Sequence, residues 1–255
     1  MKKVLCCSGL DPTGGAGIQA DIEAVAAQGA HALAVVTVLT VQDTRNVVLS
    51  TPVDAALLAQ QLHTLLADCR IDAIKIGLLG SVEQLPVLAA LLRDCGKPVV
   101  IDPILRAGGG RELLTGSLAS QVAEQLFPLC TVLTPNAAEA RRWTGCEDLD
   151  QAGARLLAMG AAHVLITGGD EPSSGVQNRW YHPDGMQLFE HSRVEGHFHG
   201  AGCTLAASLA ARLALGESVE QALIAAQDYV AQTLRQARPV GEGRWVPRRI
   251  ALGFA

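Results

Sequence analysis

Short runs of β-branched and other apolar residues alternate along this chain with longer stretches rich in alanine and leucine. The short runs have the length of buried strands, and the longer stretches space their apolar residues as a helix does. Strand and helix in alternation predict an α/β fold with a mostly parallel central sheet and helices on both faces. Expected strands are 35–38, 73–76, 99–101, 131–133 and 164–166; expected helices are 18–28, 53–67, 82–94, 118–126, 137–144, 151–159, 204–215 and 219–237.

The chain is long enough for one large domain. Its 255 residues, 49% of them hydrophobic, can bury a sizeable core, and no linker or repeat divides them, so we expect a single domain over 1–255. Two weaker runs, 179–182 and 187–190, flank Asp184-Gly185, a pair that favours a tight turn. They predict an antiparallel hairpin at the sheet edge. The last stretch, 238–255, contains glycine, proline and four arginines and is predicted to be irregular.

Charge and cysteine content exclude several classes of protein. The chain has 20 lysine and arginine residues against 25 aspartate and glutamate residues, so its net charge of -5 offers no basic surface to nucleic acid. The apolar run at 4–7 is too short for a signal peptide and no later run could span a bilayer, so we expect a cytoplasmic protein without a membrane partner. The seven cysteines are odd in number and include no Cys-x-x-Cys pair, which indicates neither disulfides nor zinc.

Polar or glycine-rich turns follow several of the expected strands, which is where open α/β sheets bind ligands. The first turn, 8–21, is a glycine-rich loop that opens a helix. Glycine lets a backbone approach a ligand closely, but this loop lacks the Lys-Ser/Thr ending of a P-loop and the glycine spacing of a dinucleotide site. A ligand loop and a simple helix-entry turn both remain open on this motif alone.

A second turn, 200–204, precedes a strongly apolar helical stretch. Successive backbone N–H groups at a helix N-terminus meet the positive end of the helix dipole and form an anion site. A kinase could stabilise a transferring phosphoryl group there. The alternative is a glycine-rich helix start with a buried cysteine, Cys203.

Two further turns carry carboxylates. In 134–139, Asn136 and Glu139 either cap a helix or hold a hydrated magnesium ion, because Mg²⁺ prefers few protein oxygens and several waters. Asp102 ends an otherwise apolar strand, where a carboxylate is often only a turn residue.

Taken in order, these turns resemble the bacterial hydroxymethylpyrimidine/phosphomethylpyrimidine kinases of thiamine biosynthesis, which belong to the ribokinase-like superfamily. The resemblance covers about residues 3–230 and leaves only the tail outside. It implies a single-domain ribokinase-like fold, a homodimer, and ATP- and Mg²⁺-dependent phosphorylation of a hydroxymethylpyrimidine and then of its monophosphate. The residues that carry it are 8–21, Gln42-Asp43-Thr44, 75–79, Asp102-Pro103, 134–139, Gly168-Gly169 and 199–204.

The resemblance also implies a role for each matching position. The substrate side would comprise Gly9, Asp21, Gln42, Leu79, Asp102 and Ile104. Lys75 would lie on the phosphate side, and Glu139 and Asp102 would bind the metal ion. The nucleotide would be bound by Asn136, Thr167, Gly168 and Gly169. The anion hole would be the turn of Gly200, Ala201 and Gly202, with Cys203 as the catalytic base. The Gln42 amide suits an aminopyrimidine, because it can donate to a ring nitrogen while accepting from the amino group.

A thiol at position 203 suits both reactions of this family. Its pKa, about 8.5 in a free thiol and lower at a helix N-terminus, would let Cys203 lose a proton and activate an alcohol. A neutral thiol would also not repel the anionic phosphate that is the nucleophile of the second reaction, whereas the aspartate of sugar-kinase branches would.

Four positions depart from the family pattern. Ala201 replaces the usual threonine but keeps the backbone donors, and Leu79 replaces methionine with similar volume. Thr167 and Asp170 stand where the family has lysine and histidine. Because positive groups would offset the repulsion between two phosphates, we expect the first phosphorylation to outpace the second by more than in relatives with those cations.

Two other functions fit parts of this pattern. A pyridoxal or pyridoxine kinase would act on a ring of similar size with a comparable hydroxymethyl group, although Gln42 argues mildly against it. A catalytically silent pyrimidine-binding protein would keep the fold without the chemistry, but Cys203, Asn136 and Glu139 are all present.

Overall fold

One sheet runs through the molecule in the computed structural model, which describes residues 1–114 and 116–250. Its order within these residues is β3-β2-β1-β4-β5-β6-β7-β8-β9. The bounds are β1 Lys3–Leu10, β2 His31–Gln42, β3 Val47–Pro52, β4 Ala73–Ile76, β5 Val99–Ile101, β6 Val132–Leu133, β7 His163–Ile166, β8 Gly175–His182 and β9 Gly185–Ser192. The central strands pair in parallel and β3, β8 and β9 pair antiparallel, so the predicted fold class is confirmed.

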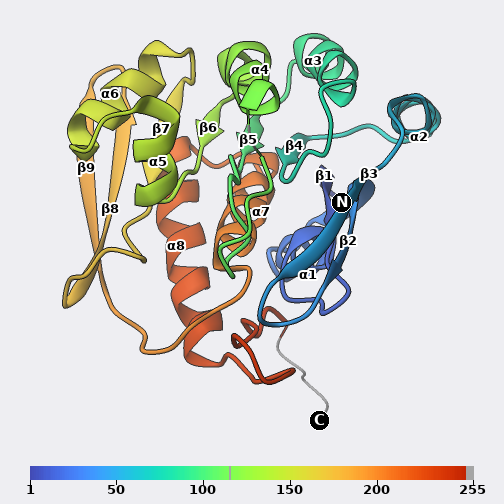
Figure 1. Cartoon of the computed structure of the whole chain (residues 1–255). Coiled ribbons are helices and arrows are strands. Elements are labelled where there is room, and N and C mark those ends of the chain that lie inside the picture. The colour runs from blue at the N-terminus through green and yellow to red at the C-terminus, as the bar shows by residue number, and fades with distance from the viewer. Residues whose placement is uncertain (115, 251–255) are drawn as a thin grey trace.

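Helices cover both faces of this sheet (Figure 1). One apolar cluster lies under α1 (Gly17–Ala27), α7 (Ala201–Ala214) and α8 (Val219–Arg235). The other lies under α2 (Ala55–Asp68), α3 (Gln84–Cys95), α4 (Gly116–Leu126), α5 (Ala137–Thr144) and α6 (Leu149–Ala158). The expected helix 137–144 has the observed bounds of α5, and the others differ by up to three residues at their ends. The predicted hairpin is β8–β9 at the sheet edge.

The other edge carries a hairpin that the sequence did not predict. β2 extends from 31 to 42 and pairs with β3, although only 35–38 was expected as a strand. The turn between them lacks the Asn-Gly or Asp-Gly signal of a tight hairpin. Asp43 closes the turn instead, because its Oδ1 accepts from the N–H groups of Arg45 and Asn46 at 2.8 and 2.9 Å.

The C-terminal tail is docked onto the fold rather than free of it. Its backbone pairs with itself at Arg238 and Val246 and with the segment before α7 at Trp245 and Phe198. The final five residues, 251–255, lie outside the described part of the chain. Among the described residues, every helix is too short or too polar to cross a membrane.

Candidate active site

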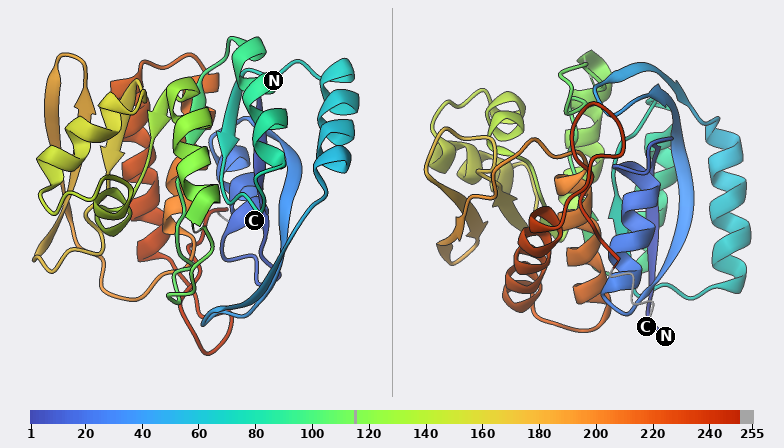
Figure 2. Two further views of the ribbon diagram at one scale, coloured as in Figure 1. Left: turned by 45° about the horizontal axis from the view of Figure 1, so that its top comes forward. Right: turned by 90° about the horizontal axis from the view of Figure 1, so that it is seen from below.

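The turns predicted to bind ligands meet at one end of the molecule. Because β1, β4, β5, β6 and β7 are parallel, their carboxyl ends share one edge of the sheet. The glycine loop, the long connection after β5, the start of α7 and the C-terminal tail gather there, at the lower end in Figure 1. Figure 2, in its right-hand view, looks onto this end.

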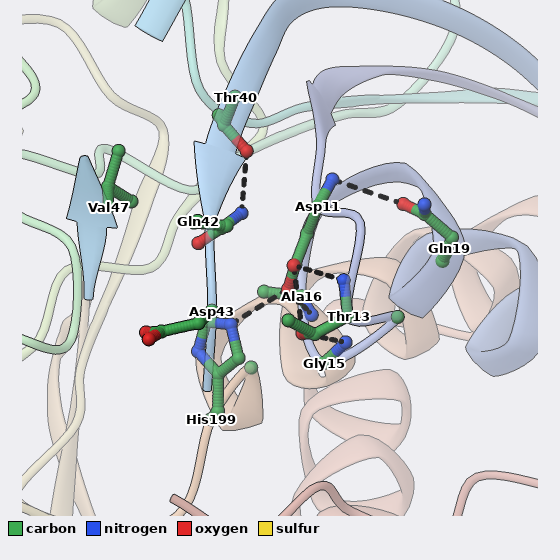
Figure 3. Close-up of polar contacts among 12 residues, drawn as sticks. Asp11, Thr13, Gly15, Ala16, Gln19, Thr40, Gln42, Asp43, Val47 and His199 are labelled. Atoms are coloured by element: carbon green, nitrogen blue, oxygen red, sulfur yellow. Dashed lines mark hydrogen bonds and ion pairs between the residues drawn. The ribbon is translucent and has the colours of Figure 1, made fainter. Parts of the chain in front are cut away.

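Asp11 organises the glycine-rich loop after β1 (Figure 3). Its Oδ1 accepts hydrogen bonds from the Thr13 N–H and hydroxyl at 2.9 and 2.8 Å, and its Oδ2 accepts from the Ala16 N–H at 2.8 Å. His199 Nε2 lies 2.8 Å from the same Oδ2 and donates to it. Burial raises the pKa of Asp11, but the hydrogen bonds from His199 and Thr13 outweigh it and lower the pKa below its ordinary value. An ionised carboxylate therefore fastens this loop to the start of α7.

Gly200 can only be glycine at the junction between these two loops. Its φ of 88° lies in the left-handed region, and a Cβ there would lie 1.9 Å from the carbonyl oxygen of Gly15. Gly15 in turn has no room for a side chain, because a Cβ would lie 2.2 Å from the His199 ring. The backbone around residue 200 is thus packed directly against the first glycine loop.

Helix α7 begins at Ala201, three residues earlier than expected, so the residues predicted to form the anion site make up its first turn. Thr204 N–H bonds to the Gly200 carbonyl, whereas the N–H groups of Ala201, Gly202 and Cys203 have no acceptor among the described residues. Three backbone donors at the positive end of a fourteen-residue helix can bind a phosphoryl group.

The expected low pKa of Cys203 is wrong for the protein without ligands. Burial raises the pKa of its thiol to about 12; Lys75 acts against this shift, and the carboxylates of Asp102 and Asp21 add to it. The helix N-terminus does not compensate for the loss of water around the sulfur. Cys203 is therefore a neutral thiol at physiological pH.

Lys75 and Asp21 form a fully buried ion pair. Lys75 Nζ lies 2.9 Å from Asp21 Oδ1 and 2.9 Å from the Ser8 hydroxyl, and both charged side chains are 0% exposed. Burial alone would lower the pKa of Lys75, but the Asp21 carboxylate raises it above its ordinary value. Both side chains are enclosed by protein in this arrangement, so the contact of Asp21 with a substrate and of Lys75 with a phosphate, which the resemblance implies, stays a prediction. Against the rise that burial causes, the positive charge of Lys75 lowers the pKa values of Cys203 and Asp102.

Gln42 ends β2 beside the glycine loop with part of its amide available. Its Nε2 donates to the Thr40 hydroxyl at 2.8 Å, which orients the side chain (Figure 3). Gly9 lies one strand away, and a Cβ there would lie 3.2 Å from Leu78 Cδ2. Leu79 itself is only 3% exposed and packs in the apolar core. Leu78, one position earlier, is the residue beside Gly9, and the place of Leu79 in a pocket wall stays a prediction.

Asp102 faces the first turn of α7. A Cβ on Gly202 would lie 3.9 Å from each of its carboxylate oxygens, and its buried Oδ2 has no hydrogen-bond partner among the described residues. Burial, with a smaller contribution from the Asp21 carboxylate, raises the pKa of Asp102 to about 6. The charge of Lys75 and a hydrogen bond from the Cys203 thiol oppose this shift. Ile104, two residues on, is half-buried at the start of the long connection.

Glu139 and Asn136 cap α5, as one of the two readings of the sequence allowed. Asn136 Oδ1 accepts from the Glu139 N–H at 2.8 Å, and Glu139 Oε2 accepts from the Asn136 N–H at 3.0 Å. Glu139 Oε1 also accepts from the Leu105 N–H at 3.3 Å. Burial raises the pKa of Glu139 to about 8, with the Asp102 carboxylate as a second cause. The two carboxyl groups therefore lie in one buried region, where the charge of Asp102 favours the protonated form of Glu139.

The turn after β7 is held by backbone and amide bonds. Thr167 exchanges hydrogen bonds with the segment before α5, through the Pro135 carbonyl and the Ala137 N–H, each at 2.9 Å. The buried Gly168 N–H donates to Asn178 Oδ1 at 2.9 Å, whereas Gly169 is exposed. These contacts fix the turn beside Asn136.

The sequence reading missed the contribution of the tail. Arg249 is 3% exposed and donates to the Gly14 carbonyl at 3.2 Å and to the Thr204 hydroxyl at 2.8 Å. It also contacts the Gly15 carbonyl. One arginine thus ties the glycine loop to α7. No local pattern marks it, whereas Asp11 and His199 stood inside quoted motifs and could have been found as polar residues beside glycines.

This fold and site define a ribokinase-like small-molecule kinase: a mostly parallel α/β sheet with the N-terminus of α7, a buried thiol and two buried carboxyl groups at the carboxyl end of its parallel strands. A family model described as phosphomethylpyrimidine kinase matches residues 11–247. The chain belongs to the phosphomethylpyrimidine kinase family. The match continues through most of the tail, so the expectation that the resemblance ends near residue 230 is wrong.

Individual relatives agree with this assignment. The chain is 36% identical to the thiamine biosynthesis bifunctional protein ThiED of Geobacter sulfurreducens, with 94% of this chain and 50% of that protein covered, so it spans about half of that relative's length. It is 34% identical to the hydroxymethylpyrimidine/phosphomethylpyrimidine kinase of Streptomyces coelicolor, with 94% and 91% covered.

Solved structures resemble the fold over nearly its whole length. An ADP complex of Bacillus subtilis pyridoxal kinase has a TM-score of 0.89 and 30% identity, with 98% of this chain and 97% of that chain covered. A phosphomethylpyrimidine kinase from Clostridium difficile has a TM-score of 0.79 and 26% identity, with 91% and 98% covered.

Proposed function

We propose that this protein transfers the γ-phosphoryl group of ATP to 4-amino-5-hydroxymethyl-2-methylpyrimidine and then to the resulting monophosphate, in thiamine biosynthesis. The observation that carries the proposal is the first turn of α7, where three backbone N–H groups with no acceptor in the described part of the chain lie beside the thiol of Cys203 and the carboxylate of Asp102. Family membership and the names of the relatives support the same acceptor.

The pyrimidine would lie between Gln42 and Gly9, with Leu78 and Ile104 beside it. One N–H of the Gln42 amide donates to Thr40. The second N–H can donate to the ring nitrogen, and the amide oxygen can accept from the amino group of the pyrimidine. The nucleotide would lie along the turn of Thr167, Gly168 and Gly169. The γ-phosphoryl group would then meet the N–H groups of Ala201, Gly202 and Cys203.

We propose a two-step path for the alcohol proton. As the alcohol oxygen bonds to the γ-phosphorus and ADP leaves, the alcohol proton passes to Cys203 Sγ and the thiol proton passes to the Asp102 carboxylate. Asp102, with a pKa raised to about 6 by burial, is the ionised partner at neutral pH, whereas Cys203 is neutral. The buried charge of Lys75 stabilises the negative charge that moves through this pair. In the second reaction the acceptor phosphate is already ionised and gives up no proton.

We also propose that Mg²⁺ binds at Glu139 and Asp102 through water, with Asn136 beside it. When bound, the ion would neutralise charge on the nucleotide phosphates. Among the described residues no group of three or more acidic, histidine or cysteine side chains forms a complete metal site. A hydrated ion shared with ATP fits this arrangement, since Mg²⁺ needs only one or two carboxylates, and the Asp102 Oδ2 without a partner suits a metal-bound water.

Magnesium affinity should increase with pH. Burial and Asp102 raise the pKa of Glu139 to about 8, so below that pH the carboxyl is largely protonated and a bound cation must displace the proton. We expect the affinity for Mg²⁺, titrated calorimetrically with ADP present, to rise up to about tenfold per pH unit between pH 6 and 8 and then to level off.

Glu139→Gln is the matched control for this titration, because glutamine preserves the capping box. It should remove the pH-dependent component beyond that of ADP itself and weaken Mg²⁺ binding. Equal pH dependence in the wild type and the variant would show that Glu139 does not face the metal.

The acceptor is tested by turnover of purified protein with Mg-ATP and a panel of alcohols. The panel comprises the hydroxymethylpyrimidine, its monophosphate, pyridoxine, pyridoxal and hydroxyethylthiazole. We expect kcat/KM to be highest for the hydroxymethylpyrimidine, with measurable turnover of its monophosphate. Turnover of pyridoxine alone would reassign the acceptor, and the absence of any turnover would leave a silent binding protein.

Pyridoxal phosphorylation is the second candidate, because the ADP complex of Bacillus subtilis pyridoxal kinase matches this fold with a TM-score of 0.89. The site favours the pyrimidine, since the Gln42 amide offers both a donor and an acceptor to an aminopyrimidine edge. We expect pyridoxal to be at most a slower substrate.

We further propose that the chain acts as one kinase domain, that it forms a homodimer and that it works in the cytoplasm. The single continuous sheet supports one domain. Exposed Leu39, Val41 and Leu49 share one face of the β2–β3 edge hairpin, and such a strip suits a second copy of the chain. The cysteines of the described structure are all free thiols, as a reducing compartment requires.

A further inference from the structure

The tail carries an arginine at the mouth of the site whose position is fixed by its backbone. The Arg244 N–H donates to the Thr44 carbonyl at 3.0 Å. Its neighbours Gly243 and Trp245 bond to the Thr44 hydroxyl at 2.9 Å and to the carbonyl of His197 at 2.9 Å. Arg244 is thereby held between the β2–β3 turn, which follows Gln42, and the segment that leads into the predicted anion site.

The guanidinium of Arg244 is partly buried, and no described residue accepts a hydrogen bond from it. Its Nη1 packs so closely on Gly108, in the connection after β5, that a Cβ there would overlap it. Its Nε is buried without a hydrogen-bond acceptor, and the guanidinium makes no ion pair within 1–114 and 116–250. By contrast, Arg249 and Arg45 contact Glu23 and Glu242. A half-buried cation with unused donors is poised to bind an anion.

The charges around Arg244 locate it at the junction of the two substrates. Burial lowers the pKa of Arg244, while the carboxylates of Asp11 and Asp170 raise it, so the guanidinium is within electrostatic reach of both. Asp11 belongs to the glycine loop on the acceptor side, and Asp170 follows the turn on the nucleotide side. Thr167 and Asp170 bring no positive charge to that junction.

We propose that Arg244 binds the phosphate of the monophosphate acceptor and so supplies the cation that the turn at Thr167 lacks. This inference rests on the proposed function. Thr44 and Gly108, which hold Arg244, lie on the pyrimidine side, and this placement favours the acceptor phosphate over the phosphates of ATP. A guanidinium can donate two parallel hydrogen bonds to a phosphate. Arg244 therefore offsets the repulsion between acceptor and ATP in the second reaction and sets its efficiency relative to the first.

Arg244→Gln is the direct test, with turnover of the alcohol and of the monophosphate measured side by side. We expect kcat/KM for the monophosphate to fall by about 10- to 100-fold, as for the loss of one charge-assisted contact, mainly through a higher KM. The fall with the alcohol should be smaller by at least a factor of about five. Arg244→Lys should recover part of the loss.

Arg238→Gln is the matched control, because it removes the same charge from an exposed position of the same tail. It should leave the ratio of the two reactions unchanged. The affinity for the monophosphate can also be measured calorimetrically without ATP. This measurement needs no turnover, so it tests the role of Arg244 separately from the proposed function. Weaker binding in Arg244→Gln supports the inference even if wild-type turnover of the monophosphate is absent. Equal losses with both acceptors, or unchanged monophosphate binding, would overturn it.

Discussion

Replacing Cys203 with alanine should lower kcat for the hydroxymethylpyrimidine by about 10²–10⁴-fold, the usual contribution of a positioned proton acceptor. ATP binding should stay within a few-fold of wild type, because the anion site consists of backbone N–H groups that the substitution leaves in place. Steady-state kinetics with the alcohol, together with ATP titration, measure both effects.

The second acceptor and the pH profile provide the controls for Cys203→Ala. The monophosphate gives up no proton, so its turnover should fall much less than that of the alcohol. In the wild type, kcat for the alcohol should rise through the pKa of Asp102, about 6, and then stay level to pH 9. A steady rise toward the pKa of Cys203, about 12, would mean that a free thiolate is the base. Full activity of the alanine variant would reduce Cys203 to a packing residue.

Gly200→Ala should nearly abolish phosphoryl transfer and destabilise the fold. The new methyl group would collide with the Gly15 carbonyl, because a Cβ would lie only 1.9 Å from that oxygen. Relief requires α7 or the glycine loop to move, which misaligns the N–H groups that bind the γ-phosphoryl. Loss of such donors costs about 10²–10³-fold in kcat. Kinetics and thermal unfolding of the purified variant measure the effect.

Gly216→Ala, at the other end of α7, separates collision from backbone strain. Its φ of 94° is close to the 88° of Gly200, yet a Cβ there would meet nothing within 4 Å. We expect only the cost of a left-handed alanine, about 1–2 kcal/mol, with kcat near wild type. If both alanine variants lose activity equally, the packing of Gly200 on Gly15 is not what aligns the site.

Local patterns were sufficient for the architecture and for most of the turns. Apolar spacing located the helices, and α5 was predicted with its observed bounds, Ala137–Thr144, because Asn136 and Glu139 form a capping box that is legible in sequence. The rule that ligand turns follow parallel strands located the glycine loop, and glycines directly before an apolar helical stretch located the start of α7. Both signals depend on residues a few positions apart.

Tertiary contacts explain what the sequence could not show. Asp11 and His199 are 188 positions apart, and Arg249 reaches Gly14 across 235 positions. The pKa of Cys203 depends on how completely the surrounding chain excludes water, which a helix-start motif does not reveal. Which of Leu78 and Leu79 lies beside Gly9 depends on the backbone direction after β4, which the sequence does not show.

The most direct test of the central claim is a single incubation of the purified protein with the hydroxymethylpyrimidine and excess Mg-ATP, followed by ³¹P NMR. We predict that a pyrimidine monophosphate forms first and is then converted to the diphosphate, with ADP released at each step. A parallel incubation with pyridoxal should proceed more slowly. Formation of pyridoxal phosphate with the pyrimidine left unphosphorylated would contradict the account.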